Sequence, residues 1–182
     1  MTTEITIYEM CEADAVNAKA TDDINRLLAQ LSSTPYHITT AGLRLMVQNA
    51  DTHLFVATKG ADIVGMITVG CYTSPTGHKA CIEDVVTDAS VRGQGIGKKI
   101  LEMWKEDIFG RDDLPLALFC SAKPRIAAVY ANYGFVKAIP FQNEEENFLY
   151  NPLKNAPATF DEFCKNYYKP SDTLIHKRAD IE

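Results

Sequence analysis

The segment from Ile82 to Lys99, IEDVVTDASVRGQGIGKK, constrains the fold more than any other part of the chain. It predicts a strand, a short loop with glycines at positions 93, 95 and 97, and then a helix. Glycines let such a loop turn with its N–H groups inward and leave no Cβ in the way of a ligand. The helix adds unpaired N–H groups and the positive end of its dipole. The segment therefore predicts an anion site, most naturally for phosphate.

Three cations in the same segment sharpen this prediction. Arg92, Lys98 and Lys99 flank the helix N-terminus, where each cation costs up to about 1 kcal/mol. A diphosphate between them would relieve the repulsion, whereas a solvated basic turn is the alternative interpretation. The P-loop pattern is excluded because Arg92 occupies its first glycine position. The dinucleotide pattern is excluded because Lys98 or Ile100 would have to be its third glycine.

The rest of the chain alternates between strand and helix patterns. Strands are expected at 4–10, 53–58, 62–72, 79–87, 115–121, 135–142 and 146–150. Helices are expected at 21–31, 39–47, 95–109, 124–133 and 159–167. Residues 73–77 form a predicted hairpin loop. This order indicates an α/β (α+β) fold with a mixed, mostly antiparallel sheet and helices on both faces.

Composition excludes several classes of protein. The chain has 182 residues and a net charge of -6, which suits one soluble domain and argues against nucleic acid as the main partner. Its five cysteines form no CxxC pair, which indicates free thiols in a reducing compartment. The four histidines show no metal-ligand spacing, so no metal is expected. Without a signal peptide or a membrane-length apolar run, we expect a cytoplasmic protein that does not enter a membrane.

Two motifs together resemble the GNAT superfamily of N-acetyltransferases. Arg92, Gly95 and Gly97 form its Arg-x-x-Gly-x-Gly loop, and Val129-Tyr-Ala-Asn-Tyr-Gly-Phe135 is similar to its second signature, Tyr-x-x-x-Gly-Phe. The resemblance implies a strongly twisted sheet of about seven strands with a splayed central pair. It also implies a GNAT domain over residues 1–150 and a C-terminal extension over 151–182. Ile82-Glu-Asp-Val85 and the loop are locally similar to glucosamine-phosphate N-acetyltransferases.

The same resemblance implies a co-substrate and a reaction. Members of this superfamily transfer an acetyl group from acetyl-CoA directly to a primary amine in a ternary complex. The alternative on the same fold is a non-catalytic acyl-CoA-binding regulatory module. The residues expected to bind the acyl-CoA are Val85, Val86, Thr87, Arg92, Gly93, Gln94, Gly95, Ile96, Gly97, Lys98 and Lys123, with Val85 to Thr87 acting through their backbone.

Acetyl transfer requires a base for the amine and a stabilising group for the departing thiolate. The resemblance assigns Tyr130 to the thiolate and favours Glu83 as the base. Since side chains alternate along a strand, only one of Glu83 and Asp84 is expected to face the acceptor, and a water chain is the alternative. His78 is a more remote candidate base. Cys120 is expected to be a core residue and not a nucleophile.

The acceptor is left open as a small-molecule or protein amine. The resemblance implies that specificity for the acceptor comes from the loops at 32–40, 73–78 and 141–147, the last of which borders the acceptor side. Three acids at 144–146 could attract a cationic amine or could simply form a solvated turn. The aromatic helix expected at 159–167 could support a homodimer.

Overall fold

The computed structural model describes residues 4–31, 36–75, 77–109, 117–122, 130–132, 134–142, 147–152, 158–159 and 162. The chain divides into two compact units. The N-terminal unit comprises residues 1–72 and 80–114, and the C-terminal unit comprises residues 73–79 and 115–182. Helices and strands alternate along the chain in a mixed α/β order, and both units contain strands that pair antiparallel.

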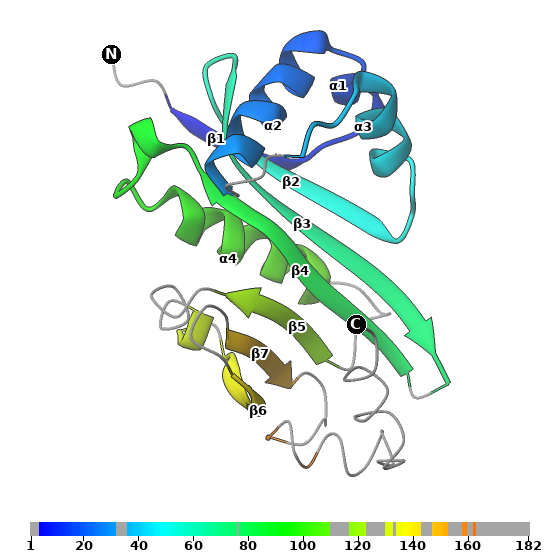
Figure 1. Ribbon diagram of the computed structural model, residues 1–182. Helices are drawn as coiled ribbons and strands as arrows, with labels where there is room; N and C mark the ends of the chain where they lie inside the picture. Colours follow the sequence, from blue (N-terminus) through cyan, green and yellow to red (C-terminus); the bar gives the residue numbers. More distant parts are fainter. Residues whose placement is uncertain are drawn as a thin grey trace, which may run out of the picture. The chain divides into compact units, whose positions relative to one another are not determined.

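The sheet of the N-terminal unit holds four strands in the order of the sequence (Figure 1). They are β1 (Ile5–Glu9), β2 (Thr52–Lys59), β3 (Asp62–Ser74) and β4 (Gly77–Thr87), the last two extending at their hairpin ends into the C-terminal unit. The predicted strands are confirmed. The hairpin loop between β3 and β4 is shorter than the predicted 73–77, because strand pairing continues to Ser74 and resumes at Gly77.

The helices of this unit were predicted with one wrong start and two omissions. Helix α2 (Ala18–Leu31) begins before Thr21, because the Asn17 side chain accepts a hydrogen bond from the Lys19 backbone N–H at 2.9 Å and so caps the helix. The short helices α1 (Glu12–Ala15) and η1 (Ala89–Val91) were not predicted. Helix α3 (Thr40–Val47) and helix α4 (Ile96–Phe109) confirm the predictions.

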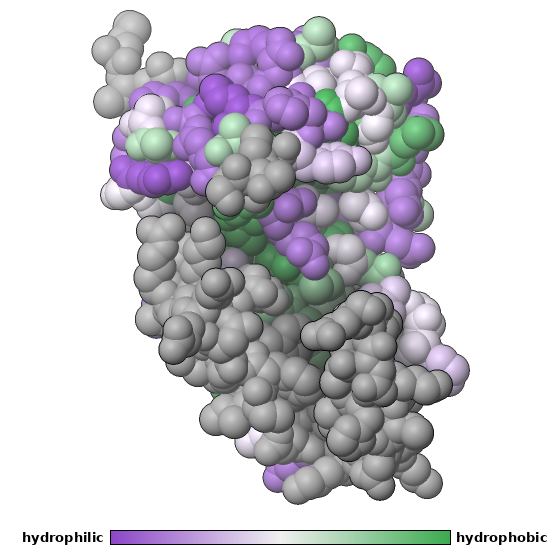
Figure 2. Space-filling model, viewed as in Figure 1, coloured by the Kyte–Doolittle hydropathy of each residue, from purple (hydrophilic) through white to green (hydrophobic). Residues whose placement is uncertain are grey.

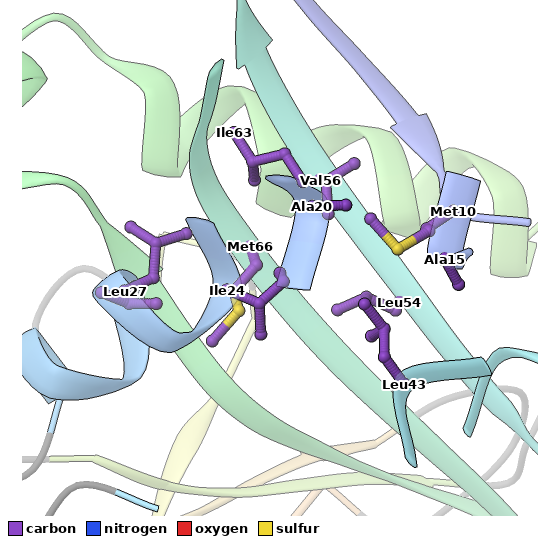
Figure 3. Close-up of a cluster of buried hydrophobic side chains, with 11 residues drawn as sticks. Met10, Ala15, Ala20, Ile24, Leu27, Leu43, Leu54, Val56, Ile63 and Met66 are labelled. Atoms are coloured by element: carbon purple, nitrogen blue, oxygen red, sulfur yellow. The ribbon is translucent and has the colours of Figure 1, made fainter. Parts of the chain in front are cut away.

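Helices cover both faces of the four-stranded sheet, as predicted. Met66 of β3 belongs to the apolar cluster that α1, α2 and α3 bury against the sheet (Figure 3). The adjacent Gly65 faces α4, where a Cβ atom would come within 2.9 Å of Ile100 Cδ1. Because consecutive side chains of a strand point to opposite faces, α4 lies on the face opposite the cluster. Packing on both faces of the sheet therefore holds the end of β4 and the start of α4 in place.

The C-terminal unit contains strands β5 (Ala117–Ala122), β6 (Val136–Gln142) and β7 (Asn147–Pro152). Strand β7 pairs antiparallel with both β5 and β6. Most of the helices predicted at 124–133 and 159–167 lies outside the described residues, although Glu162 N–H donates to Thr159 Oγ1 at 3.3 Å as a capping box requires. One sheet of about seven strands, its splayed pair and the domain boundary at residue 150 remain predictions.

The surface of the N-terminal unit is mostly hydrophilic over the helical face shown in Figure 2. Large exposed apolar side chains on this unit include Tyr36 and Leu45, at 78% and 69% of full exposure. No helix in the described ranges is long and apolar enough to cross a membrane.

Candidate active site

Strand β4 does not keep the regular alternation that the sequence predicted for its two acids. Asp84 has a φ of 50°, in the left-handed region. Among the residues that the structure describes, it is the only one besides glycines with a positive φ. Its carboxylate accepts a hydrogen bond from the Thr68 side chain of β3. The prediction that only one of Glu83 and Asp84 faces the acceptor assumed extended backbone at both residues. Asp84 does not have that backbone conformation, and the prediction itself stays a prediction.

The Glu83 and Asp84 carboxylates form a like-charged pair. The pKa of Asp84 is raised, first by burial of its carboxyl and then by the negative charge of Glu83, with the Thr68 hydrogen bond acting in the opposite direction. Glu83 accepts a hydrogen bond from Cys81 Sγ at 3.2 Å. Burial, and then the Glu83 carboxylate, raises the pKa of that thiol to about 12. Cys81 is therefore a neutral donor to Glu83 at physiological pH.

The segment after β4 is held by a buried carboxylate that sequence analysis did not single out. Asp88 is only 6% exposed and accepts hydrogen bonds from the Ser90 backbone N–H at 2.9 Å and Ser90 Oγ at 2.6 Å. It also pairs with Arg26 of α2. The spacing Asp-x-Ser after a strand is typical of a capped turn and could have revealed the local part of this arrangement. The partner on α2 is 62 residues away and left no local signal.

The glycine loop has the open backbone that the sequence predicted. Gly93 and Gly95 have φ angles of 79° and 75°, and nothing lies within 4 Å of the position that a Cβ atom would take at either residue. The first helical hydrogen bond of this turn runs from Lys99 N–H to the Gly95 carbonyl at 3.0 Å. The N–H groups of Ile96, Gly97 and Lys98 thus precede the intrahelical ladder. The loop can therefore offer several backbone donors to an anion.

The cations of the loop differ in how they are engaged. Arg92 Nε donates to the Thr87 carbonyl at 3.1 Å, and its guanidinium also reaches Gln30 Oε1 at 3.4 Å. The Lys98 side chain is 68% exposed and lies 3.6 Å from Glu102 Oε1. Arg92 therefore fastens the entry of the loop, whereas the Lys98 ammonium stands in solvent at its exit.

Other proposed acyl-CoA-binding residues sit in this same segment. Val86 is buried, Val85 and Thr87 are half-buried at the end of β4, and Ile96 is buried beneath the first turn of α4. Gln94 is exposed. Lys123 lies outside the described residues.

Tyr130 is placed in the C-terminal unit, 3% exposed. Its ring packs edge-on against Phe135, with centroids 5.4 Å apart at 81°. The turn between them is closed by a hydrogen bond from Phe135 N–H to the Tyr130 carbonyl at 3.3 Å, and Gly134 supplies the left-handed residue at a φ of 87°. Burial, and then the nearby Cys120, raises the pKa of the Tyr130 phenol. The phenol is therefore a proton-bearing group at neutral pH.

The other candidate residues, Cys120 and His78, lie in surroundings typical of structural roles. Cys120 is fully buried, in keeping with a core role. His78 Nδ1 lies 2.9 Å from Thr73 Oγ1 across the β3–β4 hairpin. Among the described residues, no group of three or more His, Cys, Asp or Glu side chains could hold a metal ion.

Comparison with protein families decides the class of the chain. The family model of the acetyltransferase (GNAT) domain matches residues 14–154. The chain belongs to the GNAT acetyltransferase family. The motifs at Arg92–Gly97 and Val129–Phe135 identified this family correctly, and the prediction of an N-acetyltransferase agrees with it.

Individual relatives are more distant. A 61-residue segment is 34% identical to glucosamine 6-phosphate N-acetyltransferase 1 of Oryza sativa subsp. japonica and spans 34% of the chain and 36% of that relative. A GNAT-family acetyltransferase of Streptococcus pneumoniae has 16% identity and a TM-score of 0.66 over 82% of the chain and all of its own. A chain of the NatC complex, solved with Gag peptide and CoA, has 19% identity and a TM-score of 0.63 over 83% of the chain and 99% of its own. These structures share the GNAT fold.

Proposed function

We propose that the protein is an acetyl-CoA-dependent N-acetyltransferase that moves an acetyl group directly to a primary amine in a ternary complex. The observation that carries this proposal is the open backbone of the Gly93–Gly97 loop, directly after β4 and at the start of α4. Family membership supports the same reaction class.

The loop fits the diphosphate of an acyl-CoA. The space beside Gly93 and Gly95 is free of neighbouring atoms, and the first-turn N–H groups of α4 have no intrahelical acceptor. In this proposal the backbone from Arg92 to Lys98 holds the diphosphate, with the Lys98 ammonium adding charge. The Val85–Thr87 backbone pairs with the pantetheine arm, one N–H polarising the thioester oxygen. Lys123 remains a proposed contact to the acyl-CoA. The proposal also includes a single sheet of about seven strands, splayed beside β4.

The acid pair on β4 supplies the base. A lysine-like amine is almost fully protonated at neutral pH, so a carboxylate must hold the ammonium and take its proton. Glu83 is the proposed base, and its donor Cys81 orients the carboxylate. Asp84 adds a second negative charge beside it, which favours a cationic acceptor. A water chain between base and amine is compatible with this arrangement.

Tyr130 is the proposed donor to the departing sulfur. Its raised pKa keeps the phenol protonated at neutral pH, as a hydrogen-bond donor to a thiolate must be. The Phe135 ring and the Gly134 turn fix the tyrosine in one orientation. This role requires the phenol hydroxyl and not merely the ring.

The acceptor is an amine on a small molecule or on a protein. The name of the rice relative indicates an amino sugar phosphate, whereas the NatC structure contains a peptide. Both are primary amines that would enter protonated. Homodimer formation and a cytoplasmic location remain predictions.

Thiol release from acetyl-CoA in the presence of an amine panel tests the function. Glu83→Gln and Tyr130→Phe should each lower kcat by about 10²- to 10⁴-fold, while CoA affinity stays within about twofold. Glu4→Gln, at an exposed position, is the matched control. Tight CoA binding without turnover for any amine would favour the regulatory alternative. Failure to bind CoA would exclude both functions.

A further inference from the structure

The side-chain amide of Gln30, near the C-terminal end of α2, makes hydrogen bonds to three residues of the segment that leads into the glycine loop. Its Oε1 accepts from the Ala89 backbone N–H at 2.8 Å and from the Arg92 guanidinium at 3.4 Å. Its Nε2 donates to Asp88 Oδ2 at 3.1 Å. The Ala89 N–H can only donate and the Asp88 carboxylate can only accept, so the orientation of the amide is fixed by its partners.

The same segment is tied to the body of the unit by a second layer of contacts. Arg26, one turn earlier on α2, pairs with Asp88 and donates to the Ile63 carbonyl of β3 at 2.8 Å. It also contacts Asp23 at 3.1 Å, and Asp23 accepts from the Ile63 N–H at 2.9 Å. Helix α2, strand β3 and the turn after β4 are therefore joined by one continuous polar network, which has Gln30 at its outer edge.

We propose that Gln30 is a positioning residue for acyl-CoA binding, because it holds the 88–92 turn in the conformation that aims the glycine-loop N–H groups at the diphosphate. Arg92 is the last residue before Gly93, and Gln30 and the Thr87 carbonyl are its hydrogen-bond partners among the described residues. Glycines at positive φ leave the loop itself few constraints, so its direction depends on how its entry is fastened. The inference rests on the proposed function, since it names acyl-CoA as the ligand of the loop.

Gln30→Met tests this role, because methionine keeps the length of the side chain and removes the three hydrogen bonds to the 88–92 turn. The dissociation constant of CoA, measured by calorimetry, should rise about tenfold, as expected for loss of two to three partly exposed hydrogen bonds. The kcat with saturating acetyl-CoA should change less than twofold. Asp22→Ala is the matched control, since Asp22 is an exposed residue of the same helix whose side chain has no hydrogen bond to the described residues, and it should change neither value.

Gln30→Glu gives a readout that a purely structural role would not move. Glutamate keeps the two acceptor contacts but places a carboxylate against Asp88, so CoA binding should be weaker than in the unchanged protein at pH 7. Protonation of residue 30 restores the donor, so the ratio of the two dissociation constants should approach one as the pH falls towards 5. Measuring both proteins at every pH removes the contribution of CoA's own phosphate titration.

Amide hydrogen exchange of the 87–95 segment separates this inference from the proposed function. Faster exchange at Ala89 in Gln30→Met, together with weaker CoA binding, would support the inference. An unchanged exchange rate, or faster exchange with unchanged CoA affinity, would overturn it. If the unchanged protein binds no CoA, the proposed function fails, and the role of Gln30 in ligand binding fails with it. Faster exchange in Gln30→Met would then still show that Gln30 holds the 88–92 turn.

Discussion

Two aspartates at the end of β4, Asp84 and Asp88, lie in opposite surroundings. Asp88 is buried and receives hydrogen bonds from Gln30, Ser90 and Arg26, so its charge is fully compensated. Asp84 stands next to the like charge of Glu83, with the Thr68 hydrogen bond as its compensation. Only four positions along the chain therefore separate an aspartate that stabilises the fold from one whose ionisation is unfavourable.

The difference indicates which acid suits the proposed chemistry. A carboxylate saturated by donors cannot take a proton from an amine without breaking its own contacts, so Asp88 is unsuited to be a base. The Glu83–Asp84 pair has properties expected of a site that receives a cation: two adjacent negative charges, with a raised pKa and a left-handed backbone at Asp84. The backbone follows the same division, since Asp88 caps a regular turn and Asp84 adopts a left-handed conformation.

Removing Asp88 should give the largest effect on stability. Asp88→Ala leaves Arg26, the Gln30 amide and the Ser90 N–H without their acceptor in a buried position. The free energy of unfolding should fall by about 3 kcal/mol, measured by urea denaturation at pH 7. Asp22→Ala, which removes an exposed aspartate from α2, should change it by less than about 0.5 kcal/mol. A loss as small as that of the control would show that the network does not stabilise the unit.

The glycine loop offers a comparison of two positions two residues apart. Gly95→Ala forces a side chain into the left-handed region at about 1 kcal/mol and places a methyl group in the open space of the loop. CoA affinity should therefore fall about tenfold or more, with lower stability. Gly97→Ala places its Cβ 3.3 Å from Thr87 Oγ1, within the first turn of α4. Equilibrium unfolding should find Gly97→Ala as stable as the unchanged protein, and calorimetry should find a smaller loss of CoA affinity than for Gly95→Ala.

Cys81 reports whether the Glu83 carboxylate lies beside it in solution. Burial and Glu83 raise the pKa of Cys81 to about 12, so alkylation by iodoacetamide at pH 8 should be slow. Glu83→Gln removes the charge that suppresses the thiolate, and the rate at Cys81 should rise severalfold. Peptide mass spectrometry resolves this rate from that of the exposed Cys11, which serves as the internal reference. Equal Cys81 rates in both proteins would place the carboxylate elsewhere.

The sequence predicted those features whose signal is local. The glycines at 93, 95 and 97 and the apolar spacing of 96–108 defined the loop and α4. The threonines at 39 and 40 predicted the start of α3, whose N-cap is Thr39. The hydrogen bonds of Gln30 and Arg26 to the turn at Asp88 join residues about sixty positions apart, and no short pattern encodes them. The left-handed backbone of Asp84 was not predicted, because the sequence of its strand reads as an ordinary extended segment. No sequence pattern identifies an aspartate that adopts a positive φ.

The smallest expected effect distinguishes the two aspartates most sharply. An Asp→Asn substitution should raise the free energy of unfolding at position 84 and lower it at position 88. Since burial and Glu83 raise the pKa of Asp84, the folded protein holds a proton there more tightly than the unfolded chain does. Stability is therefore lost as the pH rises from the ordinary value of the group through its raised value. Asp84→Asn removes that loss and keeps a residue type that tolerates positive φ.

The variant Asp84→Asn should accordingly be more stable than the unchanged protein by about 0.5 kcal/mol at pH 7, a small gain because the residue is partly exposed. The gain should shrink as the pH falls to about 3.5, where the carboxyl becomes largely protonated in both states. Asp88→Asn should instead be destabilising at pH 7, since it withdraws a charge from Arg26. Urea unfolding curves at the two pH values measure both differences. Destabilisation by Asp84→Asn at pH 7 would mean that this aspartate is a structural acid like Asp88, and the assignment of the β4 acid pair to chemistry would lose its basis.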